Sequence, residues 1–279
     1  MLKFFRLWAI LVIVAIPAQS AEAKSVNMLT LVTWNIQVGS DQSYTGNGWA
    51  KRKLALLQVL RSVEPDVICT QEGLPAQIQY LSQGLTTYSF TGVGRDDGKD
   101  AGEHCTIFFR KSRLELLQSG TFWLSDTPDT PNRTWDGMYK RICSYGQFLD
   151  RVSGKKFFVF CTHFPLNPGA QPKSARLVAR KIAELCGDSV VFLAGDFNCG
   201  PDSEAWKIFE QSALSPSNQT HKTYHVFGQP LLCLDTVFTS GSVAIIEQRV
   251  LNEKVNGVWP SDHFGFEVKA TMETLAPSR

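Results

Sequence analysis

The chain has 279 residues, of which 43% are hydrophobic and 19% are charged, as expected for one folded domain with a substantial core. Its formal net charge at pH 7 is only +2, which argues against a protein that clings to long duplex nucleic acid through a strongly basic face. Small charged substrates, single strands and short oligonucleotides remain open as ligands.

The N-terminal segment has the pattern of a secretory signal peptide. Lys3 and Arg6 precede the apolar stretch 7–16, and Ala21-Glu22-Ala23 forms a cleavage site with small residues. The apolar stretch is too short to span a bilayer. We therefore expect residues 1–23 to be removed on export to the periplasm or the extracellular space, without a stable membrane anchor. Residues 24–279, with 26 basic and 25 acidic side chains and a net charge of +1, would form a single domain.

Strand-like and helical patterns alternate along the rest of the chain, with no internal repeat and no linker between domains. The predicted strands span residues 29–33, 67–70, 106–110, 157–162, 190–194, 236–239 and 264–270. The predicted helices span residues 50–63, 75–85, 173–185 and 203–211, with Pro75 suited to a first helical turn and Asp202 or Ser203 to a cap. The order predicts an α/β fold built on sheet.

The first of these helices opens with the basic cluster Lys51-Arg52-Lys53. A solvated helix start and a phosphate-binding patch are both consistent with such a cluster. Seven cysteines lie beyond residue 23, an odd number, so at least one must lack an intramolecular partner. Cys69 and Cys161 lie inside predicted strands, and we expect both to be buried thiols.

Four predicted strands end in a polar side chain that is able to do chemistry: Asn35, Glu72, His163 and Asp196. Ligand sites of open sheets form at such strand ends. The last of the four belongs to Gly195-Asp196-Phe197-Asn198. One acidic residue after a strand is usually a cap or a turn residue, but the repetition predicts a site.

Asp262 and His263 precede the final strand, and with Asn35 and Glu72 they fit the chemistry of phosphate esters. Magnesium takes hard oxygen ligands, few of them, with water and a substrate phosphate completing the shell. Glu72, Asp262 and Asn35 are candidate ligands of this kind. An in-line attack also needs an oriented water and a base, for which His263 paired with Asp235 is suited. Hydrogen-bond donors to the phosphoryl group are available at His163, Asn198 and Arg141.

These segments resemble the endonuclease/exonuclease/phosphatase superfamily over nearly the whole chain after residue 23. The resemblance is carried, in the order of the superfamily, by Thr33-Trp34-Asn35, Gln71-Glu72, Thr162-His163, Gly195-Asp196-Phe197-Asn198, Leu234-Asp235 and Ser261-Asp262-His263. It implies a four-layered αββα sandwich, in which two packed mixed β-sheets are flanked by helices, with the site at one edge.

The resemblance also implies roles. Glu72 would be the principal ligand of Mg²⁺, with Mn²⁺ as a substitute, and Asn35 and Asp262 would assist it. Asp196 and Asn198 would align the attacking water and the phosphate. His263 with Asp235 would be a base or a phosphate clamp, and His163 would contact the phosphate. Which histidine takes which proton stays open.

The segment between residues 92 and 128 is similar to a group of bacterial secreted or periplasmic members of the superfamily. Glu103 stands where deoxyribonuclease-like members keep a carboxylate, which predicts a Glu103–His163 pair, with a surface acid in a Gly-rich loop as the alternative. Arg141 resembles an arginine that faces the site, with a surface strand as the alternative. After His163 the chain reads Phe164-Pro165-Leu166, which departs from the deadenylase-like members.

The sequence thus predicts an exported, Mg²⁺-dependent phosphoesterase that acts as a monomer on phosphodiester bonds, most of all as a nuclease on nucleic acid or nucleotides. The alternatives are a phosphomonoesterase or a sphingomyelinase-like or inositol-phosphatase-like hydrolase, and a non-catalytic binding module on the same scaffold. The sequence does not choose the substrate.

Overall fold

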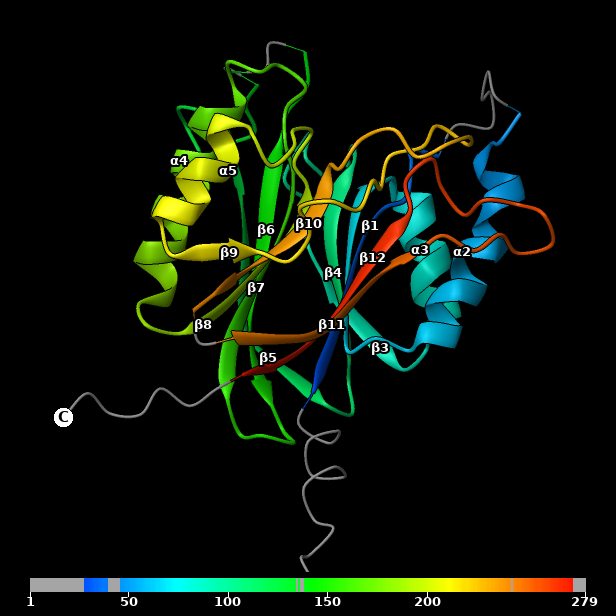
Figure 1. Cartoon of the computed structure of the whole chain (residues 1–279), viewed down its shortest axis with the longest axis horizontal. Helices are drawn as coiled ribbons and strands as arrows, with labels where there is room; N and C mark the ends of the chain where they lie inside the picture. Colours follow the sequence, from blue (N-terminus) through cyan, green and yellow to red (C-terminus); the bar gives the residue numbers. More distant parts are fainter. Residues whose placement is uncertain (1–27, 40–45, 134, 136–137, 242, 273–279) are drawn as a thin grey trace, which may run out of the picture.

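Two six-stranded β-sheets form the centre of the molecule, and helices cover their outer faces (Figure 1). The computed structural model describes residues 28–39, 46–133, 135, 138–241 and 243–272. The predicted signal peptide therefore lies outside the described residues. Among the residues that are described, none of the helices has the length and the apolar character needed to cross a bilayer.

The first sheet has the strand order β11-β12-β1-β2-β4-β3. β1 is its centre: it pairs parallel with β2 and antiparallel with β12. The strands of this sheet are β1 (Leu29–Asn35), β2 (Val67–Gly73), β3 (Tyr88–Thr91), β4 (His104–Arg110), β11 (Val243–Leu251) and β12 (Gly265–Met272). β1 and β2 run the same way, so they bring Asn35 and Glu72 to the same edge.

The second sheet has the strand order β5-β6-β7-β8-β10-β9. β7 and β8 pair parallel, and their last residues, His163 and Asp196, stand opposite one another in the register. The strands of this sheet are β5 (Leu114–Trp123), β6 (Ile142–Asp150), β7 (Lys156–His163), β8 (Val190–Asp196), β9 (Leu214–Pro216) and β10 (Asp235–Ser240). The polar ends of one parallel pair in each sheet thus supply the site.

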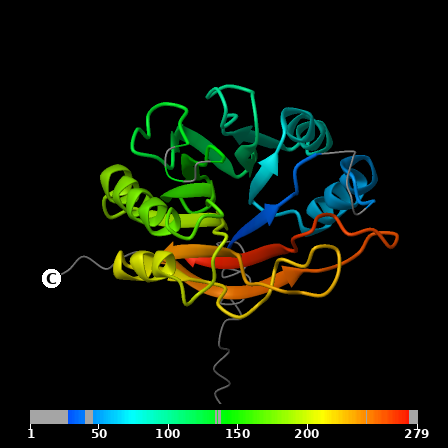
Figure 2. The same cartoon turned by 90° about the horizontal axis from the view of Figure 1, so that it is seen from above.

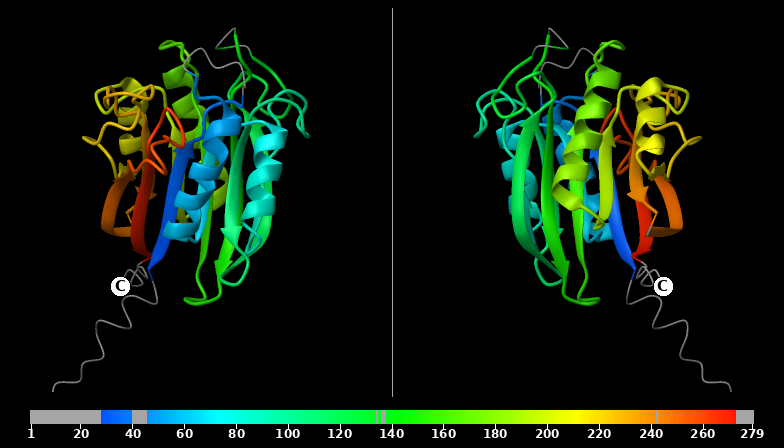
Figure 3. Two further views of the ribbon diagram at one scale, coloured as in Figure 1. Left: turned by 90° about the vertical axis from the view of Figure 1, so that its right-hand side faces the viewer. Right: turned by 90° about the vertical axis from the view of Figure 1, so that its left-hand side faces the viewer.

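The part of the chain that the structure describes forms four helices. They cover the outer faces of the sheets, as Figures 2 and 3 show from above and from both sides. α2 (Trp49–Val63) and α3 (Pro75–Gly84) pack on the first sheet, and α4 (Gln171–Cys186) and α5 (Glu204–Gln211) pack on the second. α3 begins at Pro75, and the side chain of Ser203 caps α5 by accepting a hydrogen bond from Trp206 N. The four predicted helices are confirmed within two residues at each end.

Three apolar clusters fill the spaces between these layers. The central one lies between the sheets and includes Leu31, Val67, Phe157 and Val268, while the other two lie beneath the helix pairs. Each fully buried large apolar side chain contributes on the order of 1.5–3 kcal/mol, so the sandwich holds the strand ends rigidly. The predicted four-layered αββα class is confirmed.

All seven predicted strands are present, but five further strands escaped the sequence analysis: β3, β5, β6, β9 and β11. β5 and β11 lie at sheet edges and expose many side chains, so their sequences lack a continuous apolar run. The apolar pattern of β6 is interrupted by Gly146, although the strand itself is continuous. Cys69 and Cys161 are buried free thiols, as predicted, and all seven cysteines are free.

Candidate active site

The ends of the two parallel strand pairs meet across the sandwich. Asn35 at the end of β1 donates from Nδ2 to Glu72 Oε1 at 3.0 Å and to Asp196 Oδ2 at 2.9 Å. The second bond joins one sheet to the other at the site. Asn35 and Asp196 are both 1% exposed, so this contact is shielded from water.

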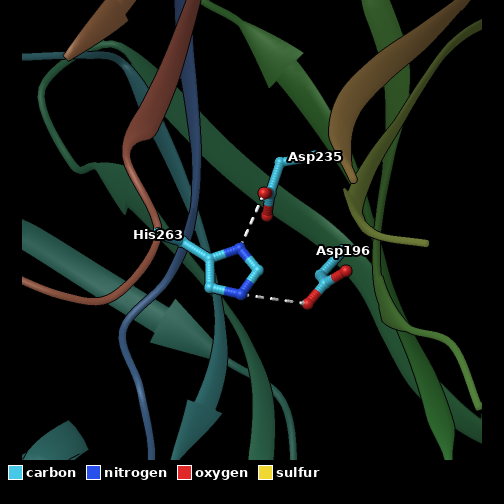
Figure 4. A group of neighbouring side chains, drawn as sticks. All are labelled: Asp196, Asp235 and His263. Carbon is cyan, nitrogen blue, oxygen red and sulfur yellow. Dashed lines mark hydrogen bonds and ion pairs between the residues drawn. The ribbon is translucent and has the colours of Figure 1, made fainter. Parts of the chain in front are cut away.

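Asp235 and His263 complete one side of the group. Asp235 begins β10, directly opposite Asp196 in the antiparallel register, and His263 precedes β12. The imidazole lies between the two carboxylates (Figure 4): His263 Nδ1 is 2.8 Å from Asp235 Oδ2, and Nε2 is 3.7 Å from Asp196 Oδ2. A carboxylate on Nδ1 fixes the ring and leaves Nε2 facing the site.

The charges of this trio depend on one another. Burial disfavours the charged form of His263, but the carboxylates of Asp235 and Asp196 outweigh burial and raise its pKa to about 10. Burial and the negative charge of Asp235 raise the pKa of Asp196 to about 7, against the opposing charge of His263. At neutral pH His263 is therefore an imidazolium, while Asp196 exchanges a proton close to neutrality.

His163 faces the same carboxylates in a different state. Its Nε2 lies 3.5 Å from Asp196 Oδ2 and 4.0 Å from Glu72 Oε1, while Arg141 Nη1 lies 2.8 Å from its Nδ1. A guanidinium only donates hydrogen bonds, so Nδ1 accepts and the ring proton is on Nε2. Burial, together with the positive charges of Arg141 and Arg95, lowers the pKa of His163 well below its ordinary value. His163 is thus a neutral hydrogen-bond donor.

Arg141 and Glu103 are not the surface residues that the alternative interpretations of the sequence described. Arg141 lies on no open surface, since it is 5% exposed and bonded to His163. Glu103 Oε2 is 4.0 Å from His163 Nδ1, too far for a hydrogen bond, and pairs instead with Arg95 Nη1 at 2.5 Å. Glu103 and His163 thus lie side by side at ion-pair distance, while Arg141 makes the hydrogen bond to Nδ1.

Glu72 is held in an uncommon conformation. Its φ is +65°, in the left-handed region that side chains other than glycine rarely adopt, and such strain concentrates at functional sites. Glu72 Oε2 accepts a hydrogen bond from Val38 N at 2.8 Å. Across the site, Gln37 Nε2 donates to Asp262 Oδ2 at 3.1 Å, and burial raises the pKa of Asp262.

The donor set fits a hard divalent cation. Glu72 and Asp262 offer carboxylate oxygens, which Mg²⁺ and Mn²⁺ prefer. The amide nitrogen of Asn35 bridges Glu72 to Asp196. Asn35 Oδ1 instead accepts from Gln37 N at 3.0 Å. To ligate a metal, Asn35 would have to turn its amide.

Asp196, Asp235 and His263 also place ligand atoms within 4.8 Å of one another. An imidazolium that donates to Asp235 has no lone pair on Nδ1 to give to a metal. We therefore assign this trio to hydrogen bonding and proton exchange rather than to metal binding.

Asn198 braces the turn after β8. Its φ is +50°, its backbone N–H donates to Asp196 Oδ1 at 2.9 Å, and its Nδ2 donates to the carbonyl oxygen of Phe164 at 2.9 Å. These bonds orient the carboxylate of Asp196. The Asn198 side chain is thereby held beside the end of β7.

Three residues at the site had no motif that would have singled them out. Gln37 positions Asp262, and the Tyr224 ring packs against His263 with 4.8 Å between ring centroids. Arg52 overturns both readings of the basic cluster, because it is fully buried and donates to the carbonyl oxygens of Ile36 and Pro260 at 2.8 Å each. It ties together the loops that carry Asn35 and Asp262. Only its place in a basic cluster hinted at a role.

Comparisons with known proteins agree with this geometry. A solved endonuclease/exonuclease/phosphatase from Bacteroides vulgatus has 31% sequence identity, covers 88% of this chain and 99% of its own, and gives a TM-score of 0.83. A mannosyl-6-phosphatase from Bacteroides thetaiotaomicron has 30% identity, covers 88% of this chain and all of its own, and gives a TM-score of 0.79.

Tyrosyl-DNA phosphodiesterase 2 from Danio rerio is 30% identical over 187 residues, which make up 65% of this chain and 45% of that protein. The chain spans about half the length of the curated relatives that come first in the comparison. The family described as Endonuclease/Exonuclease/phosphatase matches residues 32–263, a range that begins in β1 and reaches His263. The chain therefore belongs to the Endonuclease/Exonuclease/phosphatase family.

Proposed function

We propose that this protein is a divalent-metal-dependent phosphoester hydrolase that cleaves phosphodiester bonds of nucleic acid or nucleotides. The observation that carries the proposal is the placement of His263 between Asp235 and Asp196, with His163 on the other side of the Asp196 carboxylate. Phosphoryl transfer needs positioning and stabilisation of negative charge more than covalent chemistry, and this arrangement offers both.

The side chains divide the work as follows. Asp196, with a pKa near neutrality, orients a water for in-line attack on phosphorus and accepts a proton from it as the bond to the leaving oxygen breaks. The Nε2–H groups of His163 and His263 donate hydrogen bonds to the phosphoryl oxygens. A metal held by Glu72 and Asp262, with Asn35 beside them, would supply Lewis-acid polarisation of the phosphate.

The relatives support a phosphoester substrate and favour two candidates. Tyrosyl-DNA phosphodiesterase 2 is named for the cleavage of a phosphodiester, and mannosyl-6-phosphatase for the cleavage of a phosphomonoester. This protein covers the whole chain of the mannosyl-6-phosphatase. We keep the phosphomonoesterase as the second candidate on that ground. A non-catalytic binding module is disfavoured because Asn35, Glu72, His163, Asp196, Asp235 and His263 are all present and mutually bonded or in close contact.

The test compares bis(p-nitrophenyl) phosphate with p-nitrophenyl phosphate as substrates of the purified protein in Mg²⁺, in Mn²⁺ and in chelator. We expect metal-dependent release of p-nitrophenol, faster from the diester. Asp196→Asn should lower kcat by roughly 10²–10⁴, whereas Asp188→Asn, an exposed residue at the opposite end of β8, should not change it. Turnover in chelator, or full activity of Asp196→Asn, would contradict the proposal.

We also propose that residues 1–23 direct export and are removed. The support is the sequence pattern of that segment alone. N-terminal sequencing of protein recovered from the periplasm or the culture medium should begin at residue 24, and recovery of uncleaved chain from the cytoplasm would overturn this part of the proposal.

A further inference from the structure

A cavity of about 520 Å³ lies beside the active site and is not used by the chemistry described above. It is lined by Arg95, Asp96, Arg133, Met138, Tyr139 and Lys140. Met138 and Tyr139 are well exposed, at 66% and 41%, so the cavity opens to solvent. These residues belong to the loops that precede β4 and β6.

The cavity shares part of its wall with the reaction centre. Arg95 and Lys140 line both this cavity and a narrow space whose other walls include Glu72, Arg141 and His163. This shared wall of Arg95 and Lys140 places the cavity next to the space that reaches Arg141 and His163. No protein segment that the structure describes fills the cavity.

The inner wall of the cavity is held in place before any ligand arrives. The carbonyl oxygen of Arg95 accepts from Trp123 Nε1 at 2.7 Å, and its guanidinium pairs with Glu103. The guanidinium carbons of Arg95 and Arg141 lie 5.2 and 5.4 Å from the centroid of the Tyr139 ring. Lys140 Nζ donates to the carbonyl oxygen of Asp96 at 2.6 Å. A preorganised wall binds its ligand with less ordering cost.

The charge of this region is positive. Three positive side chains, Arg95, Arg133 and Lys140, and one acid, Asp96, line the cavity. Arg95 is also paired with Glu103 behind the cavity wall. The carboxylate of Asp96 packs against Gly102. A Cβ on residue 102 would lie 2.4 Å from Asp96 Oδ2. The excess of two positive charges in the cavity lining contrasts with the carboxylates of Glu72 and Asp262, which suit a metal.

We propose that this cavity, defined by Arg95, Arg133, Tyr139 and Lys140, binds a second phosphate group of the substrate, so that the enzyme prefers substrates that carry another phosphate beside the scissile one. The inference rests on the proposed hydrolase function and names the substrate class for the same site. Arg133 and Lys140 supply charge-assisted hydrogen bonds, which are about twice as strong as neutral ones. Tyr139 and Met138 contact the carrier between the two phosphates.

A matched substrate pair tests the proposal directly. Thymidine 5′-(p-nitrophenyl phosphate) is compared with the same compound carrying a 3′-phosphate, in Mn²⁺ with p-nitrophenol release as the readout. We expect the 3′-phosphate to lower KM by about tenfold, the scale of one charge-assisted hydrogen bond, with kcat within about twofold. Equal KM values for the two compounds would overturn the proposal.

Variants locate the effect. Arg133→Gln and Lys140→Gln should each bring the ratio of the two KM values close to one. Lys207→Gln, an exposed lysine on α5 outside the cavity, should leave the ratio at its wild-type value. A ratio that stays high in both cavity variants would place the second phosphate elsewhere and overturn the assignment.

Binding without turnover separates this inference from the proposed function. Calorimetry with adenosine 3′,5′-bisphosphate and adenosine 5′-monophosphate, and in a second arm with glucose 1,6-bisphosphate and glucose 1-phosphate, measures the preference for two phosphates on two carriers. If bis(p-nitrophenyl) phosphate is not hydrolysed but bisphosphates bind about tenfold tighter through Arg133 and Lys140, the hydrolase proposal fails and the subsite stands. Equal binding of both members of each pair overturns the subsite.

Discussion

Arg141 Nη1 donates a hydrogen bond to His163 Nδ1 across 2.8 Å, and this bond decides the protonation state of a histidine in the active site. Arg141→Met removes the donor while keeping an unbranched side chain of useful length. We expect the pKa of His163 to rise towards its ordinary value and the Nδ1–H tautomer to appear, because Nδ1 is then free to take a proton. Imidazole ¹⁵N chemical shifts report both changes directly.

The same substitution should lower kcat by about 10², since His163 then loses its fixed donor direction. Arg151→Met, which removes an exposed arginine paired with Glu115, serves as the control and should change neither property. An unaltered tautomer in Arg141→Met would show that Arg141 does not set the state of His163.

The Asp235–His263 pair predicts a stability profile in alkaline solution. The folded-state pKa of His263 is about 10, above an unfolded value of about 6.5. Its stabilising contribution is therefore complete below pH 6.5 and is lost as the pH rises from there towards 10. Asp235→Asn removes the first carboxylate that raises this pKa, so the decline between pH 6.5 and 10 should flatten.

Urea-unfolding midpoints of wild type and Asp235→Asn, measured in chelator from pH 6 to pH 10, test this expectation. The variant should also be less stable than wild type at pH 6, because it leaves a buried imidazolium without its partner. Parallel curves for the two proteins over the whole range would count against the pair as the source of the pH dependence.

Metal binding should stabilise the fold through Glu72. At about a hundred times its Kd, Mg²⁺ that binds only the native state adds about 2.7 kcal/mol to the free energy of unfolding. We expect a corresponding rise in Tm for wild type and none for Glu72→Gln. Glu210→Gln, an exposed acid on α5, should respond like wild type. A Glu72→Gln variant stabilised as much as wild type would move the metal away from Glu72.

Gly195 permits the close approach of β8 to β7 immediately before Asp196. A Cβ on this residue would lie 2.2 Å from the carbonyl oxygen of Thr162, a backbone atom that cannot rotate away. Gly195→Ala should lower the free energy of unfolding by about 1–3 kcal/mol through overpacking and reduce kcat by displacing Asp196. Gly241→Ala, whose Cβ would meet nothing within 4 Å, is the matched control. Chemical denaturation and turnover of both variants provide the comparison.

Much of the site was predictable because it lies at the ends of regular elements. Asn35, Glu72, His163 and Asp196 follow apolar runs that read clearly as strands, and the parallel pairing of β1 with β2 and of β7 with β8 brings them to one edge. The position where an apolar run gives way to a polar residue predicts where a buried strand ends. The helices were equally clear, because their apolar spacing and their Pro75 and Ser203 starts agree.

The relations between distant residues were not recorded in any local pattern. Arg141, directly before β6, hydrogen-bonds to His163, and Glu103 lies beside the same ring at 4.0 Å but pairs more closely with Arg95. Gln37 acts through a hydrogen bond to Asp262, and Arg52 acts through hydrogen bonds to backbone carbonyl oxygens. No sequence periodicity predicts these bonds. Tertiary packing alone selects these partners.

The chain order of the two sheets has a consequence for biosynthesis. The second sheet is one continuous stretch, β5 to β10, whereas the first sheet receives β1 to β4 early and β11 and β12 only after that stretch is complete. Until β12 emerges, β1 presents one unpaired edge, and Asp235 and Asp196 stand without His263. The candidate site is therefore assembled only when β12 pairs with β1 and brings His263 to Asp235.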